Sequence, residues 1–174
     1  MIMSPGVRRF ALTIHIAASV GWLGAVGCFL ALALAGLNSR DAQTVRAVYI
    51  ASDLTTWSVI VPLGLASLVT GVVQALGTPW GLFRHYWVAA KLLLTALATG
   101  LLLLHTRPIR SMADAAARTE LRADDLRGVR VQLAADAGAA LLVLLGVTAL
   151  SVYKPQGLTR YGWRKRREER LVLR

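Results

Sequence analysis

The stretch HYWVAAKLLLTALATGLLLLH, residues 85–105, decides the fold class of this chain. Between its two terminal histidines it is almost entirely apolar, and Lys91 is its only internal charge. A helix of about 20 apolar residues is needed to cross a hydrocarbon core of about 30 Å. Backbone groups in lipid must pair within their own segment, so a crossing segment of this kind is a helix. The stretch therefore predicts a transmembrane helix that carries three ionisable side chains.

Three other segments of the chain have the same character. Of the 174 residues, 56% are hydrophobic, and the mean hydropathy is +0.55, whereas soluble domains average about 45–50% apolar residues. We therefore predict an all-α integral membrane protein, a single domain over residues 1–174 that folds as an up-down-up-down four-helix transmembrane bundle. The predicted helices are 8–36, 54–76, 86–105 and 132–153.

The segments between the predicted helices are more polar. Residues 77–85 are predicted to form a short turn, and 37–53 and 106–131 to form longer loops. The last loop is rich in Ala, Leu, Arg and Glu, which favour helix, so we expect a short surface helix in it that ends at Gly128. Pro62, midway along the second predicted helix, predicts a kink because proline lacks the N–H of a helical hydrogen bond.

Basic residues predict the orientation of the chain in the membrane. Four crossings place both termini on one side, with eleven Lys and Arg residues, against eight on the other side. This excess predicts that both termini are cytoplasmic, in a bacterial plasma membrane. The tail, 154–174, combines eight basic residues with Tyr161 and Trp163. We expect it to anchor the chain to anionic lipid, and docking of a partner protein is the alternative.

Several classes of protein are disfavoured by the same patterns. The net charge of +11 does not indicate a nucleic-acid partner, because the basic residues lie between and after the apolar runs. The first apolar stretch runs from Phe10 to Leu37, which is longer than the about 7–15 residues of a signal peptide core, so it is expected to remain as the first helix. Cys28, the only cysteine, is expected to be a small packing residue.

Ionisable side chains inside a membrane are costly, and each is therefore a candidate site residue. At 1.5 Å per residue, His15 and Lys91 both lie about 10 Å inside the cytoplasmic boundary, on different helices. Gln74, near the cytoplasmic end of the second predicted helix, could join them. The stripe of the third helix that should face the bundle interior consists of Trp87, Lys91, Thr95 and His105.

A second polar layer is predicted at the opposite membrane boundary. His105 lies about 20 Å from the level of His15 along the membrane normal. Asp136 lies one turn inside the fourth predicted helix, at the level of His105, and the two are plausible partners, because an unpaired aspartate at that depth would be protonated. His85, on the far side of its helix, is interpreted as a boundary residue.

His15 has the features of a haem ligand. Membrane bundles bind b-type haem through histidine, and small residues beside His15 leave room for a flat ring. The candidate cofactor-binding residues are His15, as the iron ligand, with Trp22, Trp87 and Lys91. Lys91 would pair with a haem propionate or with an anionic substrate. The alternatives are that His15 only bonds a neighbouring helix and that Lys91 extends to the headgroups.

Two of these stretches resemble known families. LTIHIAASVGWLG, residues 12–24, resembles the first helix of the HemJ-type and CopD-type membrane proteins, and YWVAAKLLLTALATGLLLLH, residues 86–105, is similar to the HemJ-type third helix. The resemblance implies a haem b-binding four-helix bundle with His15 as ligand and Lys91 near the site. HemJ-type proteins oxidise protoporphyrinogen IX. The chain as a whole also resembles a group of small bacterial membrane proteins of unknown function.

Two functional hypotheses follow from the sequence. The first is a haem b-binding protein for electron transfer or haem handling, with a redox partner in the membrane. The second is a non-enzymatic accessory or scaffold protein without a cofactor, whose polar residues only set helix register. A copper role is disfavoured because copper handling would require methionine and histidine ligands and the chain has only three methionines. A transporter is disfavoured because the sequence has no inverted repeat. The sequence leaves open whether the protein catalyses a reaction.

Overall fold

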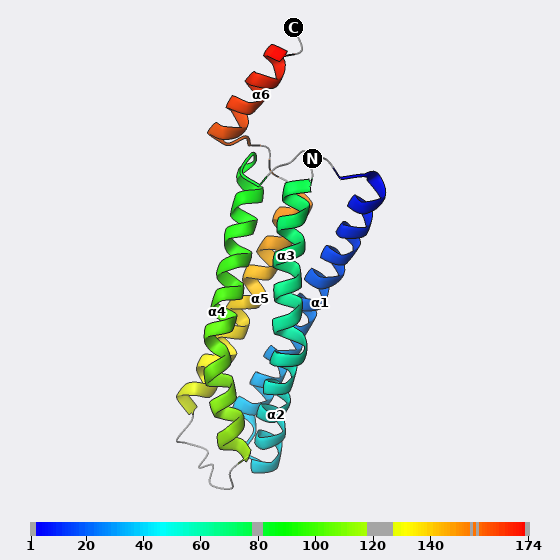
Figure 1. Cartoon of the computed structure of the whole chain (residues 1–174). Coiled ribbons are helices and arrows are strands. Elements are labelled where there is room, and N and C mark those ends of the chain that lie inside the picture. Colours follow the sequence, from blue (N-terminus) through cyan, green and yellow to red (C-terminus); the bar gives the residue numbers. More distant parts are fainter. Residues whose placement is uncertain (1–2, 78–81, 118–126, 154, 156, 173–174) are drawn as a thin grey trace.

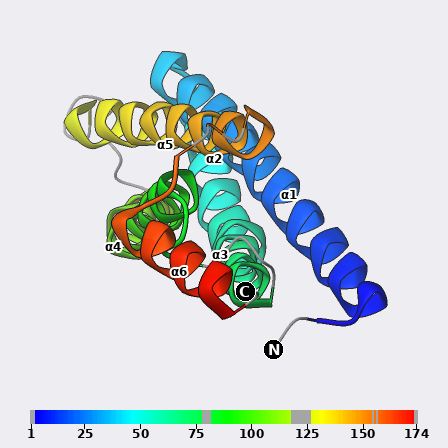
Figure 2. The same cartoon turned by 90° about the horizontal axis from the view of Figure 1, so that it is seen from above.

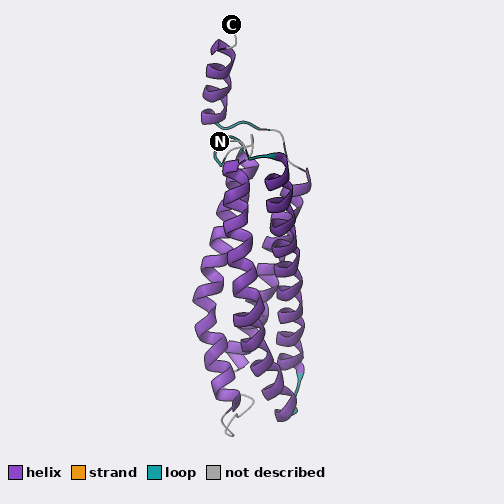
Figure 3. Ribbon diagram, turned by 45° about the vertical axis from the view of Figure 1, so that its right-hand side comes forward, coloured by secondary structure: helices purple, strands orange, loops and turns teal. Residues whose placement is uncertain are grey.

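The protein is an all-α bundle. The computed structural model describes residues 3–77, 82–117, 127–153, 155 and 157–172. These residues form helices joined by short connections, with no β-strand among them (Figure 3). The helices run alternately up and down, which confirms the predicted fold class (Figure 1). The spans long and apolar enough to cross a membrane are Pro5–Asn38, Ala42–Gly77, Tyr86–Asp114 and Arg127–Tyr153.

The first span is helix α1, Pro5–Asn38, slightly longer than predicted. It begins with proline at its first position, where the missing N–H would have had no helical partner. Its buried face contributes Trp22, Phe29 and Ala33 to the core. Towards its N-terminal end α1 leans away from the other helices (Figures 1 and 2).

Most of the loop predicted for residues 37–53 is helical. Helix α2, Ala42–Thr55, begins at Asp41, whose carboxylate accepts a hydrogen bond from the Thr44 backbone N–H at 2.8 Å. The Thr44 hydroxyl and N–H hold the pKa of Asp41 below its usual range. Val45, Val48 and Tyr49 recur at helical spacing and are buried. This apolar face packs α2 against α1 and α4, so the second helix starts well before the predicted residue 54.

Helix α2 continues into α3, Val61–Gly77, through a π-helical turn, η1, Thr56–Ile60. The Val61 N–H bonds to the Thr56 carbonyl, five residues back. This wider turn lies immediately before Pro62, which has no N–H to continue a regular ladder. The structure therefore has a π-helical turn next to Pro62 within one continuous span of 36 residues, and the kink at Pro62 stays a prediction.

The third and fourth helices also extend beyond their predicted ends. Helix α4, Tyr86–Ala117, includes half of the loop predicted for 106–131. Helix α5, Arg127–Tyr153, starts five residues before the predicted residue 132. Gly128 had been expected to end a surface helix, and this prediction is wrong, because Gly128 is the second residue of α5. The remainder of that expected helix, 118–126, lies outside the described residues.

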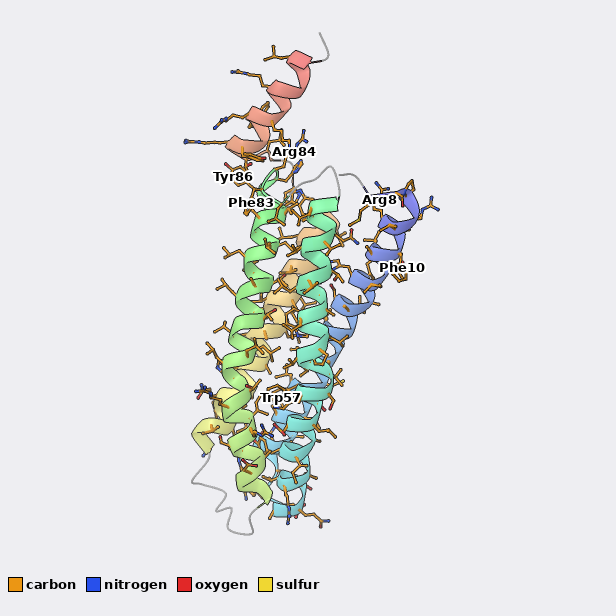
Figure 4. All side chains as sticks on the ribbon, viewed as in Figure 1. Arg8, Phe10, Trp57, Phe83, Arg84 and Tyr86 are labelled. Atoms are coloured by element: carbon orange, nitrogen blue, oxygen red, sulfur yellow. The ribbon has the colours of Figure 1, made fainter. Side chains whose placement is uncertain are left out.

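The tail forms a further helix, α6, Arg160–Val172, which projects beyond the bundle above the start of α4 (Figures 1 and 2). A short backbone pairing attaches it, in which the Thr159 N–H donates to the Arg84 carbonyl at 3.0 Å. The Thr159 hydroxyl donates to the Phe83 carbonyl, and the Gly162 N–H donates to the Thr159 hydroxyl. The labelled Phe83, Arg84 and Tyr86 lie at this junction in Figure 4.

Gly162 is required at the junction, because a Cβ on this residue would overlap the Arg84 carbonyl oxygen. We predict that Gly162→Ala releases α6 from the bundle and speeds trypsin cleavage after Lys165 in detergent. Gly157→Ala is the matched control, since its Cβ would meet the Tyr86 ring at an ordinary 3.6 Å. Equal cleavage rates in Gly162→Ala and the wild-type protein would show that this contact does not hold α6.

The core lies between α1, α2, α4 and α5, and large apolar side chains cover the outside of every span. Leu93, Leu97, Leu104 and Leu142 are more than half exposed. In water such a surface would be unfavourable, whereas in a bilayer it faces lipid tails. The exposed apolar surface therefore agrees with the length of the helices in placing the bundle within a membrane.

Candidate functional site

Three helices bring polar side chains together around His15. The His15 imidazole on α1 is half-buried, and its Nδ1 lies 2.9 Å from the Thr70 hydroxyl of α3. Its Nε2 lies 3.4 Å from the Lys91 ammonium of α4. The structure thus brings together the two residues that depth alone had placed at one level.

The hydrogen bonds assign the tautomer of His15. The Thr70 hydroxyl donates its hydrogen to the Ala66 carbonyl at 2.6 Å. The hydroxyl oxygen is then an acceptor, so His15 Nδ1 carries the hydrogen and donates it. Nε2 is left unprotonated, and its lone pair faces the Lys91 ammonium group. A neutral histidine oriented in this way by its second nitrogen is the form that binds metals in proteins.

Lys91 supplies an uncompensated positive charge to the same layer. Among the described residues no carboxylate lies within ion-pair distance of its ammonium group, which contacts His15 Nε2 instead. A lysine held inside a bundle without a counterion favours an anionic partner. The alternative of extension to the headgroups is not what the structure shows, because the side chain turns to His15.

The polar layer extends along the seam between α1 and α3. Ser19 and Ser67 share a hydrogen bond of 2.8 Å one turn further into the membrane. In the other direction, the amide nitrogen of Gln74 is buried and has no hydrogen-bond partner within the described ranges. Gly71 keeps the seam close, because a Cβ there would lie 3.2 Å from the His15 ring. The layer therefore has a spare donor in addition to Lys91.

The two tryptophans expected at the site lie in different surroundings. Trp22 is 3% exposed and belongs to the core, with its ring against Gly64, where an added Cβ would lie 3.1 Å away. Trp87 is half-buried, and its ring centroid lies 6.5 Å from that of His85. His85 itself pairs with Leu158 at the junction with the tail. Cofactor binding by Trp22 and Trp87 stays a prediction.

The second layer is present at the opposite end of the bundle. His105 Nε2 lies 3.0 Å from the Asp136 carboxylate, with the two side chains 29% and 40% exposed. The other ring nitrogen of His105 lies 2.8 Å from the Leu101 carbonyl, to which an N–H can donate. The pair is separate from His15, and neither His105 nor His85 is placed beside it. Among the described residues no group of three His, Cys, Asp or Glu side chains could hold a metal ion.

Ser67 and Thr70 on α3 were missed by the sequence reasoning. Ser67, Thr70 and Gln74 recur at intervals of three and four residues and so share one helical face. That polar stripe in an apolar span was a usable signal, of which only Gln74 had been singled out. Gly71, within the stripe, marks where α1 approaches.

Comparison with protein families identifies the chain at the level of its family. Residues 10–155 match the family described as predicted integral membrane protein (DUF2269). They include both polar layers and the candidate membrane spans apart from the first five residues of α1. The chain belongs to this family. No curated protein and no solved structure matches it. As a DUF2269 protein, the chain is an integral membrane protein. Its resemblance to HemJ-type and CopD-type proteins rests on the two quoted sequence stretches alone.

Proposed function

We propose that this DUF2269 protein binds haem b inside the membrane, with His15 Nε2 as the axial ligand, and serves in electron transfer or haem handling. The observation that carries the proposal is the tautomer of His15. Thr70 accepts the Nδ1 hydrogen, which leaves the Nε2 lone pair directed into the bundle. This is the arrangement that orients histidine ligands in metalloproteins.

The residues present fit haem under one condition, which concerns Lys91. Its ammonium group lies 3.4 Å from Nε2 and faces the lone pair that would bind iron. The distance is long for a hydrogen bond, and the four-carbon stem of lysine can turn aside. Lys91, and the spare donor of Gln74, would then be free to pair with propionates. Haem would supply a one-electron redox centre, and we therefore expect a redox partner in the membrane that exchanges electrons with it.

A single protein ligand has a spectroscopic consequence. The two other histidines do not lie beside His15, since His105 pairs with Asp136 and His85 lies by the tail. We therefore propose that the protein supplies one axial ligand only. A reduced-minus-oxidised absorption spectrum of protein purified from haem-replete cells should show a Soret band of five-coordinate, high-spin type. Haem-free protein after such growth, with its folding verified by circular dichroism, would refute the proposal.

The accessory or scaffold hypothesis is the second candidate, and a specific observation favours it. His15 has partners for both ring nitrogens within the bundle, Thr70 and Lys91. A polar layer satisfied in this way can fix the register of α1, α3 and α4 without a ligand. The same spectrum separates the two candidates, because the scaffold requires no chromophore.

We further propose that the protein lies in a bacterial plasma membrane with both termini cytoplasmic and α6 bound to anionic lipid. Basic residues support this orientation, since Arg8 and Arg84 lie at the same end of the bundle as α6 (Figure 4). Exposed cations and two aromatic side chains lie close together on α6: Arg160, Tyr161, Trp163, Arg164, Lys165 and Arg167. Trypsin cleavage after Lys165 should be slower in nanodiscs containing phosphatidylglycerol than in phosphatidylcholine alone, and equal rates would exclude lipid binding by α6.

A further inference from the structure

A buried polar cluster that the proposed function does not use lies at the end of the bundle opposite the termini. It combines Tyr49 and Ser52 of α2, each 2% exposed, with Arg130 of α5, 4% exposed. The Arg130 guanidinium carbon lies 5.8 Å from the centre of the Tyr49 ring. Charged side chains are rarely buried to this degree unless they are paired.

The cluster lacks the partners that burial requires. The Tyr49 hydroxyl, the Ser52 hydroxyl and Arg130 Nε have no hydrogen-bond partner among the residues that the structure describes. Within the described part of the chain no carboxylate forms an ion pair with Arg130. An unsatisfied buried donor costs about 1–3 kcal/mol, and more when it is charged. These unsatisfied donors on neighbouring parts of α2 and α5 therefore point to a ligand that accepts hydrogen bonds.

The backbone around the cluster adds to the positive field. Arg130 lies in the first turn of α5, which has no acidic residue. The free N–H groups of a helix N-terminus carry a partial positive charge and favour anions. The Tyr49 hydroxyl extends towards α1, where Gly36 makes room for it, because a Cβ there would lie 3.1 Å from the hydroxyl oxygen.

One carboxylate restricts the kind of anion. Asp53 lies one turn along α2 from Tyr49 and is beyond ion-pair distance of Arg130. Its Oδ1 is buried and has no hydrogen-bond partner in the described part of the chain. A ligand that carries an ionised carboxylate would be repelled by the negative charge of Asp53. A phosphate group that keeps one hydroxyl can accept from the three donors and donate to Asp53.

We propose that Tyr49, Ser52, Asp53 and Arg130 form a site for a protonated phosphate group, which enters from the aqueous side opposite the termini. The site is distinct from the layer around His15, and haem binding could fail while phosphate binding holds. The phosphate can be free or be the monoester headgroup of a phospholipid such as phosphatidic acid, because a phosphodiester headgroup has no hydroxyl to donate to Asp53.

The site can be tested with the purified full-length protein in phospholipid-free detergent. The measurement is the midpoint of thermal unfolding, compared between inorganic phosphate and chloride at equal ionic strength. Phosphate should raise the midpoint of the wild-type protein and of Arg127→Gln, but not that of Arg130→Gln. Arg127 is the matched control because it is an exposed arginine in the same turn of α5. Acetate should have less effect than phosphate. No phosphate effect on the wild-type protein, or an equal effect on Arg130→Gln, would overturn the proposal.

Ser52→Ala keeps the test decisive if Arg130→Gln does not fold. Loss of one hydrogen bond to a charged group should weaken phosphate binding roughly tenfold. Unchanged affinity in Ser52→Ala would contradict the assignment. Native mass spectrometry of the same preparation separates the two sources. A co-purified phospholipid that is retained by Arg127→Gln and lost in Arg130→Gln identifies a headgroup, and its absence together with a phosphate effect identifies the free anion.

Discussion

Replacing His15 with alanine should remove haem completely from the purified protein. His15 Nε2 is the one histidine lone pair that the bundle directs into the layer with Lys91, and its orientation depends on the Thr70 hydroxyl. Alanine keeps the helix, because it has the highest helix propensity, so the variant should still fold. The measurement is the haem-to-protein ratio from the absorption spectrum, compared with helical content from circular dichroism.

The other two histidines are the controls for this prediction. His105 lies at the opposite end of the bundle, paired with Asp136, and His85 lies at the junction with the tail. His85→Ala and His105→Ala should therefore retain the wild-type haem content. Retention of haem in His15→Ala would refute the ligand assignment even if the protein binds haem elsewhere.

Replacing Trp22 with alanine should lower the free energy of unfolding by about 3–5 kcal/mol, the range for large aromatic residues removed from a packed core. Trp22 is 3% exposed and joins α1 to α3 through contact with Gly64. Its removal leaves a cavity that a close-packed seam cannot fill. Equilibrium unfolding in mixed micelles, followed by circular dichroism, measures the change.

Trp57→Ala is the matched control, since that side chain is 44% exposed on the outside of the bundle. It is expected to change stability much less than Trp22→Ala. Similar losses in the two variants would show that Trp22 does not have the core position described. Loss of haem from Trp22→Ala with unchanged stability would instead favour the cofactor-binding role predicted from the sequence.

The four spans could be predicted because lipid solvation imposes a minimum length and apolar character on each of them. The helix ends could not be placed in the same way. Residues 42–53 and 106–117 contain charges and were therefore interpreted as loops, although Val45, Val48 and Tyr49 recur at helical spacing. A continuous apolar run predicts only the part of a helix that lies in lipid. The extensions at 42–53 and 106–117 are stabilised instead by contacts between helices.

The same distinction applies to the site. Counting residues from the membrane boundary placed His15 and Lys91 at one depth, because the rise of a helix is constant. Which further helix contacts His15 depends on how the helices pack, and the contribution of Thr70 to orienting His15 was therefore not predicted. Arg130 was counted as a loop residue, so its burial against Tyr49 was not foreseen either.

The protonation site on the His15 ring is the most direct test of the account, because the ligand orientation and the contact with Lys91 both depend on it. Nitrogen-15 NMR of histidine-labelled, haem-free protein in lipid reports which ring nitrogen carries the hydrogen. The account predicts hydrogen on Nδ1 and a free lone pair on Nε2, with the assignment made by loss of the signal in His15→Ala. Hydrogen on Nε2, with Nδ1 unprotonated, would contradict it.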